Sequence, residues 1–507
     1  MSSAPVVEAQ DWGWRYSGRN RWATSGLTFS ISPGERVLLL GGSGAGKSTL
    51  LSALTGVLGG ADEGEEHGKL LVNGKHPTRI RGRVGLVMQD PSSQVILERV
   101  GDDVAFGCEN LCVPREQIWP RVRAALDAVH LDLPLDHPTH ALSGGQQQRL
   151  AIAGALAMQI GTDRIGVAGA PGILCLDEPT ANLDPVGIVE VREAISSVVA
   201  DRRTTLVVVE HRIEVWVDLV DRVIALAPGG GLIADGPPRE VFTHHREELS
   251  AAGAWVPGVD SGIHARPQPT GRAEPLLWAE DLSIGYAPQH PVHTHLATRI
   301  PARRATAVTG PNGAGKTTLA LTMAGVLPPL AGQVQTAPEL RPTASQHLTR
   351  RLRRHFDPAQ QSTWPSRDLL TRIGSVFQNP EHQFVEATVH DELAVGLRTL
   401  GRSTQQTSTR VDELLAQLHL DHIAEANPFT LSGGEKRRLS VGTVLATSPT
   451  VILLDEPTFG QDRNTWIDLV KLVQSILDEG RTIISVTHDD AYLRVLGENI
   501  IAMEPTA

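Results

Sequence analysis

Short runs of apolar residues alternate along both halves of the chain with stretches whose apolar positions recur every three to four residues. Two such runs, at residues 172–176 and 451–454, end in acidic turns and are followed by amphipathic stretches. This alternation predicts strands joined by helices, because parallel strands need a crossover between them. We therefore expect an α/β fold with a mainly parallel sheet and flanking helices in each half.

Two further apolar runs, at 37–40 and 305–308, lead into glycine-rich loops with the sequences GGSGAGKS and GPNGAGKT. The pattern GxxxxGK[ST] turns successive backbone N–H groups around phosphate oxygens at the start of a helix, whose dipole favours negative charge. We expect the lysines to reach the β and γ phosphates of a nucleotide and the final hydroxyls to bind Mg²⁺. The residues predicted to bind the phosphates are Gly41, Gly42, Ser43, Gly44, Ala45, Gly46, Lys47, Ser48 and Thr49 in the first loop. In the second loop they are Gly310, Pro311, Asn312, Gly313, Ala314, Gly315, Lys316, Thr317 and Thr318.

The two halves keep the same order and spacing of these features. Gln89 stands 54 residues before Ser143, and Gln378 stands 54 residues before Ser432. A repeat of about 270 residues indicates a duplicated domain, since solenoid repeats are far shorter. A stretch rich in proline and glycine separates the copies. We predict a first domain over 1–255, a linker over 256–273 and a second domain over 274–507.

Both acidic turns place two carboxylates at the end of a buried strand pattern. An unpaired carboxylate inside a sheet is costly, so its position predicts a nearby cation. We expect Asp177 and Asp455 to hold Mg²⁺, and Glu178 and Glu456 to polarise the water that attacks the γ-phosphate. Each glutamate is followed at similar spacing by a histidine, His211 or His488. A histidine at a strand end is often structural, but the recurrence favours contact with the γ-phosphate and the water.

Composition narrows the class of protein. The chain has 507 residues and a formal charge of −11, which argues against a nucleic acid as its main partner. It has no apolar run long enough for a membrane span and no signal-peptide pattern, so we expect a cytoplasmic location. Three cysteines, Cys108, Cys112 and Cys175, are too few for a disulfide framework, and we expect them to be buried apolar residues.

The segments LSGGQQQ at 142–148 and LSGGEKR at 431–437 resemble the signature of the ATP-binding cassette (ABC) family. The matching motifs run from Tyr16 to His211 and from Tyr286 to His488, which is nearly the whole chain. The resemblance implies two tandem P-loop NTPase domains, each with an added helical subdomain, that bind and hydrolyse ATP. The signature residues that would contact ATP are Ser143, Gly144, Gly145, Ser432, Gly433 and Gly434.

In this family each signature segment serves the nucleotide held by the opposite domain, so the two halves would form an intramolecular dimer. The resemblance pairs Lys47 with Ser432 and Gly434, and pairs Lys316 with Ser143 and Gly145. Tyr16 and Tyr286 match the position that stacks on adenine, although core packing explains either tyrosine about as well. Gln89 and Gln378 match the glutamine that senses the γ-phosphate and Mg²⁺.

The residues after these glutamines resemble the ATPase pair of energy-coupling factor importers, fused into one chain. The resemblance implies a transmembrane coupling subunit, a substrate-binding membrane subunit and a place on the cytoplasmic face of the membrane. The solute would be a vitamin, a vitamin precursor or a transition-metal ion, and a separate membrane protein would select it. An arginine-bearing partner helix would meet acids in the groove beside the glutamine; alternatively, these acids cap local helices. They are Asp102, Asp103, Glu381, Asp391 and Glu392.

Several segments depart from the repeat. The first half has Ser92 and Ser93 where acids are common, and the loop at 459–463 (FGQDR) differs from its counterpart at 182–185 (NLDP). From this loop we hypothesise unequal hydrolysis rates at the two sites. We interpret three segments as solvated loops: an insertion that carries Arg350, Arg351, Arg353 and Arg354, a second insertion around 159–170, and a histidine cluster of His290, His293 and His295. For the arginines, contact with lipid headgroups or with a partner is the alternative.

Two alternatives to an importer of the energy-coupling factor type are a sugar importer and an ABC ATPase that acts on ribosomes. A sugar importer also uses paired ATPases, but one of its sites commonly departs from the standard residues, and both sets are complete here. A soluble ABC ATPase acting on ribosomes typically has a long charged helical linker, whereas this linker is short and rich in proline and glycine. The sequence therefore favours transport.

Overall fold

The computed structural model describes residues 4–60, 62–159, 172–181, 183–267, 271, 273–342 and 356–504. It forms two compact units. Unit 1 comprises Met1–Asp260 and Gly460–Asn464, and unit 2 comprises Ser261–Phe459 and Thr465–Ala507. The division after Asp260 falls inside the predicted linker, although the domain limits of 1–255 and 274–507 stay a prediction.

Among the described residues, the main sheet of unit 1 has six strands in the order β5-β6-β7-β3-β8-β9. Their bounds are β5 (Val84–Val87), β6 (Gly172–Asp177), β7 (Thr204–Val209), β3 (Arg36–Leu40), β8 (Arg222–Leu226) and β9 (Leu232–Gly236). All neighbours pair in parallel except β8 and β9, which are antiparallel. A separate antiparallel sheet contains β2 (Thr24–Ile31), β1 (Val7–Tyr16) and β4 (Gly64–Val72). The expected mainly parallel α/β architecture is confirmed.

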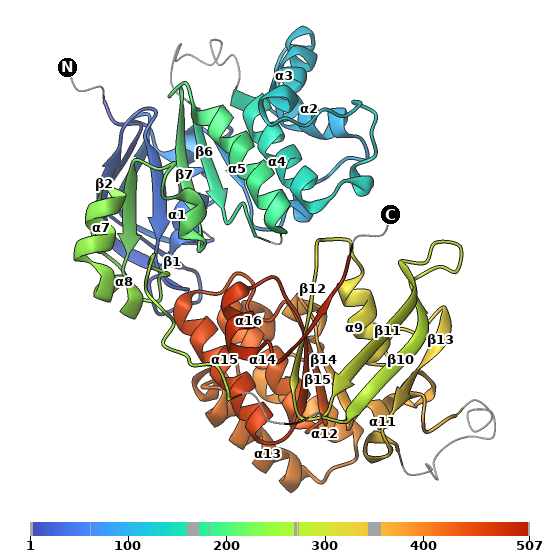
Figure 1. Cartoon of the computed structure of the whole chain (residues 1–507). Coiled ribbons are helices and arrows are strands. Elements are labelled where there is room, and N and C mark those ends of the chain that lie inside the picture. The colour runs from blue at the N-terminus through green and yellow to red at the C-terminus, as the bar shows by residue number, and fades with distance from the viewer. Residues whose placement is uncertain are drawn as a thin grey trace. The chain divides into compact units, whose positions relative to one another are not determined.

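Alternate residues of each central strand face two different cores. On β3, Leu38 and Leu40 pack with the helices α2 to α5, whereas Val37 and Leu39 pack with α1 and the antiparallel sheet. Strands buried on both faces are apolar throughout, which explains the short continuous runs in the sequence. The helices of unit 1 are α1 (Lys47–Leu54), α2 (Val100–Asn110), α3 (Arg115–Ala128), α4 (Gly144–Gln159), α5 (Pro185–Val199), α6 (Ile213–Trp216), α7 (Pro238–His244) and α8 (Arg246–Ala251) (Figure 1).

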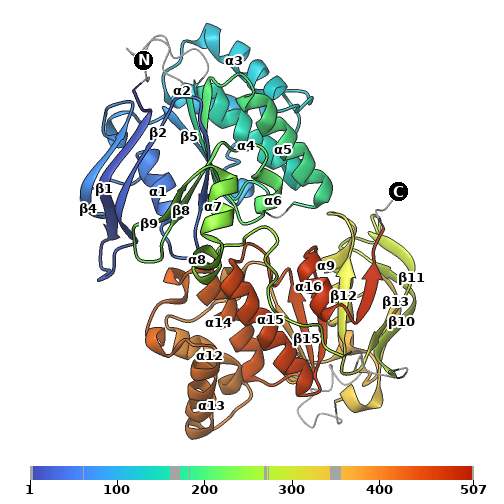
Figure 2. The same ribbon diagram turned by 60° about the vertical axis from the view of Figure 1, so that its left-hand side comes forward.

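Unit 2 repeats this plan. In the part of the chain that is described, its main sheet has five parallel strands: β14 (Ile373–Val376), β15 (Val451–Asp455), β16 (Thr482–Val486), β12 (Ala305–Thr309) and β17 (Asn499–Ala502). Figure 2 shows its antiparallel sheet of β11 (His293–Pro301), β10 (Pro275–Ile284) and β13 (Ala331–Thr336). The helices are α9 (Lys316–Met323), α11 (Ser366–Leu370), α12 (Val389–Thr399), α13 (Thr404–Gln417), α14 (Gly433–Ala446), α15 (Arg463–Asp478) and α16 (Asp490–Leu496).

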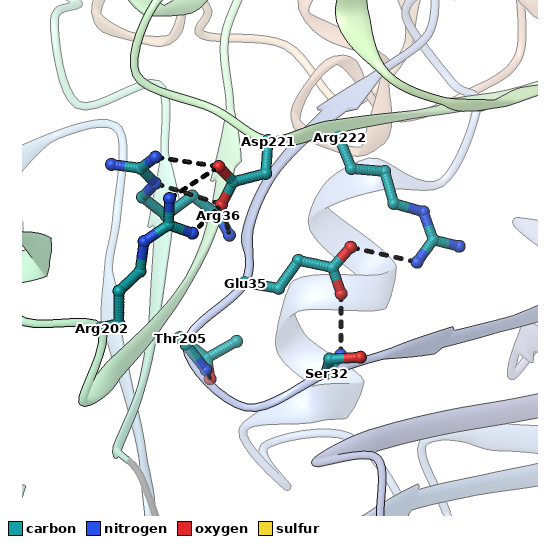
Figure 3. Close-up of polar contacts among 8 residues, drawn as sticks. Ser32, Glu35, Arg36, Arg202, Thr205, Asp221 and Arg222 are labelled. Carbon is teal, nitrogen blue, oxygen red and sulfur yellow. Dashed lines mark hydrogen bonds and ion pairs between the residues drawn. The ribbon is translucent and has the colours of Figure 1, made fainter. Parts of the chain in front are cut away.

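An arginine–carboxylate cluster fixes β3 at the end opposite its glycine-rich loop (Figure 3). Arg36, the first residue of β3, donates from Nη2 to Asp221 Oδ1 over 2.9 Å, and Arg202 donates to the same carboxylate from both terminal nitrogens. Just before the strand, Gly34 has φ 73°, and a Cβ there would lie 2.2 Å from the Arg202 carbonyl oxygen. This turn therefore requires glycine, and the cluster ties β3 to the chain around β7 and β8.

The second part of the predicted linker is bound to unit 2. Arg266 forms ion pairs of 2.8 Å with Glu498 and 2.9 Å with Asp478. The His264 carbonyl accepts a hydrogen bond from Gln474 Nε2 over 2.9 Å. Residues 264–266 therefore lie along unit 2.

Candidate functional site

The glycine-rich loop of unit 1 lies between β3 and α1, at residues 41–46, and Lys47 opens the helix. Gly46 has φ 87°, and a Cβ there would lie 2.6 Å from Thr24 Cβ, so the last glycine of the loop has no room for a side chain. Lys47 is buried, and its Nζ donates to the carbonyl oxygens of Gly41 and Gly42 at 2.8 and 3.0 Å. Burial lowers the pKa of Lys47, against nearby carboxylates that favour its charged form.

The loop of unit 2, residues 310–315 between β12 and α9, has the same construction. Gly315 has φ 79°, and a Cβ there would lie 2.6 Å from Val292 Cγ1. Lys316 is buried and donates from Nζ to the Pro311 carbonyl over 2.9 Å. Both lysines therefore fold back over their own loops at a helix N-terminus, which suits an anion held by backbone N–H groups.

A strand-end aspartate meets a loop hydroxyl in each unit. Burial raises the pKa of Asp177 to about 6, while the Ser48 hydroxyl favours its ionised form. Thr317 Oγ1 donates to Asp455, with a distance of 3.1 Å to Oδ2, and burial also raises the pKa of Asp455. Burial disfavours the ionised carboxylate unless a cation lies beside it. The carboxylate and the hydroxyl together supply the hard oxygen ligands that Mg²⁺ prefers.

The catalytic candidates Glu178 and Glu456 follow directly, and both have left-handed backbone, with φ 47° and 44°. In unit 1, Gln89 Nε2 donates to Glu178 Oε2 over 2.8 Å, and His211 Nε2 lies 3.3 Å from Glu178 Oε1. In unit 2, His488 Nε2 lies 3.6 Å from Glu456 Oε1, and burial raises the pKa of Glu456 to about 7. The structure thus brings together glutamate and histidine in both units.

The signature serines directly precede helices. Ser432 caps α14: its Oγ accepts from Glu435 N over 3.4 Å, and Glu435 Oε2 accepts from Ser432 N over 2.8 Å. Ser143 stands before α4 in the same relation to Gln146. Gly144 and Gly433 are the first helical residues, with Gly145 and Gly434 next. The pairing of each segment with the opposite nucleotide stays a prediction.

Sequence reasoning missed a difference four residues further along these helices. Arg437 is 3% exposed and donates from Nη1 to the Phe377 carbonyl and from Nη2 to the Gln378 carbonyl, over 2.9 and 2.7 Å. It thereby ties the signature helix to the glutamine loop. Gln148 takes its place in unit 1, is 1% exposed, and has no hydrogen-bond partner for either amide atom among the described residues. The sequence signal for this difference is the charged residue Arg437, which stands in the second signature helix where the first has the uncharged Gln148.

The two tyrosines differ in their surroundings. Tyr16 ends β1, and its hydroxyl lies 3.2 Å from Thr49 Oγ1, in the helix that follows the phosphate loop. The Arg19 guanidinium lies 5.8 Å from the centre of its ring. Tyr286 is 70% exposed, so core packing does not explain it. An exposed aromatic ring is available to stack on a base, and the adenine contact of Tyr286 stays a prediction.

Most of the acids expected to meet a partner helix have partners within the chain, but the alternative that they cap local helices is wrong, because other residues are the N-caps of the described helices there. Asp103 Oδ1 accepts from the backbone N–H groups of Ile96 and Leu97, and buried Glu392 accepts from those of Val385 and Glu386. The remaining contacts pair Glu381 with Lys436 and Asp391 with Arg398. Asp102 is exposed at the start of α2. These acids of unit 2 therefore form ion pairs or accept backbone hydrogen bonds.

The remaining predictions concern the cysteines, the histidine cluster and the insertions. Cys108 and Cys175 are buried, but Cys112 is exposed, because it lies where the chain turns outward after α2 with φ 55°. His293 and His295 contact the Ala314 carbonyl and Asp281, respectively. The arginines of the predicted insertion (Arg350, Arg351, Arg353 and Arg354), Asn182 and residues 160–170 lie outside the described residues.

Comparison with known proteins identifies the family. The ABC transporter family model matches residues 24–181 and 294–459, so it covers both units. The chain belongs to the ABC transporter family. Members of this family bind ATP and are ATPases, and this ABC protein is accordingly an ATPase. None of the helices that the structure describes is long and apolar enough to cross a membrane.

Relatives of this ABC ATPase match it over nearly their whole length. A protein of Bacillus subtilis described as a putative HMP/thiamine import ATP-binding protein, YkoD, is 31% identical over 507 residues, covering 95% of this chain and 86% of that protein. A putative ABC transporter ATP-binding protein of Methanosarcina acetivorans is 31% identical over 552 residues, covering 99% of this chain and 85% of that protein. The fused arrangement of two ATP-binding domains therefore recurs in these relatives.

Solved structures agree on the fold. The archaeal ribosome recycling factor aABCE1 is 19% identical, covers 97% of this ABC ATPase and 87% of that chain, and superposes with a TM-score of 0.58. At this identity the likeness extends to fold alone. The protein cbiO1 of Clostridium perfringens, described as part of the ABC transporter complex cbiONQ, is 32% identical and covers 47% of this chain and 91% of its own, with a TM-score of 0.41.

Proposed function

We propose that this chain is the ATP-hydrolysing subunit of a membrane importer of the energy-coupling factor type. It would couple ATP binding and hydrolysis at two sites to uptake of a vitamin, a vitamin precursor or a transition-metal ion. The observation that carries the proposal is the full-length similarity to a protein described for HMP/thiamine import. Among the solutes, this similarity favours thiamine or its pyrimidine precursor.

The residues of each unit would divide the work of hydrolysis. Lys47 and Lys316 bind the β and γ phosphates while the loop N–H groups hold their oxygens. Glu178 and Glu456 accept a hydrogen bond from the attacking water, which aligns it with the γ-phosphate. The paired histidine, 3.3 or 3.6 Å from the glutamate, orients the same water and contacts the γ-phosphate.

Mg²⁺ would be held by Ser48, Gln89 and Asp177 in one site. The corresponding residues in the other site are Thr317, Gln378 and Asp455. When bound, the ion neutralises charge on the β and γ phosphates. The hydroxyl and carboxylate pairs would suit it, because they supply hard oxygen ligands where desolvation makes a lone carboxylate unfavourable.

Two composite sites would link the chemistry to movement. Each ATP would be bound by the loop of one half and the signature segment of the other, so that two nucleotides join the halves and hydrolysis releases them. Converting the two halves from mostly open to mostly closed takes about 5.5 kcal/mol of differential binding. Each of the two nucleotides would supply about half of this free energy, which is under 3 kcal/mol. Docked membrane helices would follow this opening and closing.

Partner recognition would use the groove beside each glutamine loop. The ion pairs of Glu381 with Lys436 and of Asp391 with Arg398 are partly exposed. Such pairs contribute about 1 kcal/mol or less, so an arginine on a partner helix can replace the internal cation at little cost. The predicted partners are the coupling subunit and, through it, the substrate-binding subunit.

Affinity purification of the tagged chain from its own host tests the transport assignment. We expect small multispanning membrane proteins to co-purify from detergent-solubilised membranes. Proteoliposomes containing that complex should take up labelled thiamine or its pyrimidine precursor when ATP is supplied, and Glu178→Gln combined with Glu456→Gln should abolish uptake. Sedimentation of the chain with ribosomes, without membrane partners, would instead support the translation alternative.

Unequal hydrolysis at the two sites is the first quantitative prediction. We expect Glu178→Gln and Glu456→Gln to lower ATPase turnover by different factors, about 10-fold or more apart, because the loops after the two glutamates differ. Steady-state phosphate release with each single variant and the double variant measures this. Equal losses from the two single variants would contradict the asymmetry while leaving the ATPase assignment intact.

A further inference from the structure

A buried carboxylate directly precedes the histidine of unit 1. Glu210 is 3% exposed and accepts four hydrogen bonds. Its Oε1 accepts from the backbone N–H of Thr180 over 3.0 Å and from the Thr180 hydroxyl. Its Oε2 accepts from the N–H groups of His211 and Arg212, over 2.8 and 3.2 Å. One side chain therefore joins the turn after Glu178 to the turn that carries His211.

Unit 2 makes the same connection with a different residue. Asp489 directly follows His488, and its Oδ2 accepts from the Thr458 hydroxyl over 2.8 Å. Its Oδ1 accepts from Ala491 N and Tyr492 N, which caps α16. The threonine contacted, two residues after the catalytic glutamate, is the equivalent of Thr180. The carboxylate thus precedes the histidine in one unit and follows it in the other.

The surrounding residues change in concert. Where unit 1 has Glu-His-Arg at 210–212, unit 2 has Thr-His-Asp at 487–489. The extra methylene of a glutamate compensates for its earlier position in the chain, so that both carboxylates reach the threonine. Arg212 stands at the N-cap of α6, the place that Asp489 occupies at α16. An arginine side chain has no acceptor for helix N–H groups, so Arg212 cannot cap α6 as Asp489 caps α16.

The connection bears on the reacting groups because Glu178 has left-handed backbone, with φ 47°. A non-glycine residue holds this conformation at a cost of about 1 to 3 kcal/mol, and its surroundings must maintain it. The contacts of Glu210 with Thr180 and His211 flank the pair formed by Glu178 and His211, whose side chains lie 3.3 Å apart. A change at Glu210 would therefore alter the geometry of that pair.

We propose that Glu210 is a positioning residue for hydrolysis at the site that contains Glu178, where it performs the task of Asp489 in unit 2. The inference rests on the proposed role of Glu178 in activating water. Glu210 touches neither nucleotide nor water in this scheme. It holds two turns in register, so its loss should slow turnover and leave the affinity for ATP nearly unchanged.

The test exchanges the two arrangements in the full-length chain. All variants carry Glu456→Gln, so that turnover reports the site of Glu178. Glu210→Thr should lower kcat about 10-fold to 100-fold, the range expected when a reacting group is misplaced, with KM for ATP altered less than about threefold. Adding Arg212→Asp, which recreates Thr-His-Asp, should restore kcat to within about threefold of the parent. Arg212→Asp alone, which keeps Glu210, is the matched control and should retain the parental kcat.

Each other result would overturn the proposal. An unchanged kcat for Glu210→Thr, or a rise in KM with kcat intact, would mean that Glu210 does not position the reacting groups. A double variant as slow or as unstable as Glu210→Thr would mean that the two arrangements are not equivalent. If Glu178→Gln with Glu456→Gln still hydrolysed ATP, the assignment of Glu178 itself would be wrong, and this is measured separately.

Discussion

At the scale of single residues, Gln148 and Arg437 occupy equivalent places in the two signature helices but have different surroundings. Arg437 satisfies two carbonyls of the glutamine loop, and burial lowers its pKa to about 10, still well above neutral pH. Gln148 is buried without a hydrogen-bond partner in the part of the chain that is described. A buried amide in this state is unfavourable, because it has lost its bonds to water without replacing them.

Replacing these residues by methionine should change stability in opposite directions. Gln148→Met removes two unpaired polar atoms at similar volume, so we expect the free energy of unfolding to rise by about 1 kcal/mol. Arg437→Met leaves the carbonyls of Phe377 and Gln378 unpaired and should lower it by about 2 to 4 kcal/mol. Urea denaturation followed by fluorescence measures both. Destabilisation by Gln148→Met would indicate that its amide is hydrogen-bonded in solution.

At the scale of elements, the strand that leads into the first phosphate loop is anchored at its far end. Arg36 and Arg202 both bind Asp221, which lies just before β8 (Figure 3). Burial alone would raise the pKa of Asp221, but the hydrogen bonds from Arg36 and Arg202 outweigh it and lower the pKa. A carboxylate whose pKa is lowered by folding stabilises the folded state when it is ionised.

Asp221→Asn should therefore destabilise the protein in a pH-dependent way. Above the pKa of an unfolded aspartate, about 3.9, the whole contribution is present, and it is lost as pH falls through the lower pKa of the folded state. We expect a loss of about 1 to 2 kcal/mol at pH 7, limited by the partial exposure of Asp221, and a smaller difference from the parent below about pH 4. Urea midpoints at pH 7, 5 and 3.5 measure it. Asp201→Asn, at an exposed ion pair, is the control and should change little.

At the scale of the whole molecule, the proposal of shared nucleotides can be tested in the intact chain. Gly144 and Gly433 are suitable positions, because a Cβ at Gly433 would meet no atom within 4 Å and one at Gly144 would make ordinary contact, 3.5 Å from Leu183. Glutamate at either position would repel a phosphate while the fold is retained. The substitutions can be combined with Lys47→Ala, which removes the lysine of one loop.

The two combinations should differ in the nucleotide that they retain. Lys47→Ala with Gly433→Glu affects the same predicted site and should leave about one ATP bound per chain, whereas Lys47→Ala with Gly144→Glu affects both sites and should leave about none. This follows because each predicted site draws on both halves, and an anion beside the phosphates opposes binding. Counting trapped ATP in the Glu178→Gln, Glu456→Gln background measures it. If the combination with Gly144→Glu kept about one ATP and the combination with Gly433→Glu kept about none, each half would bind its nucleotide with its own signature segment.

The sequence by itself determined the parallel α/β class, the duplication, and the position of both glycine-rich loops at the start of a helix. These features depend on local patterns: apolar runs mark strands, glycines mark loops that only they can form, and equal spacing marks a repeat. The positions of Asp177 and Glu178 at a strand end also followed from pattern, since a buried strand cannot hold unpaired carboxylates.

Only the tertiary structure decided how residues distant in sequence combine. The contacts of Glu210 with Thr180, of Arg437 with the glutamine loop and of Asp221 with two arginines join separate segments, and no periodicity in the chain encodes them. The same reason explains Glu381 and Asp391, whose internal partners Lys436 and Arg398 are supplied by folding. Local patterns specify elements, whereas the pairing of polar side chains depends on which elements pack together.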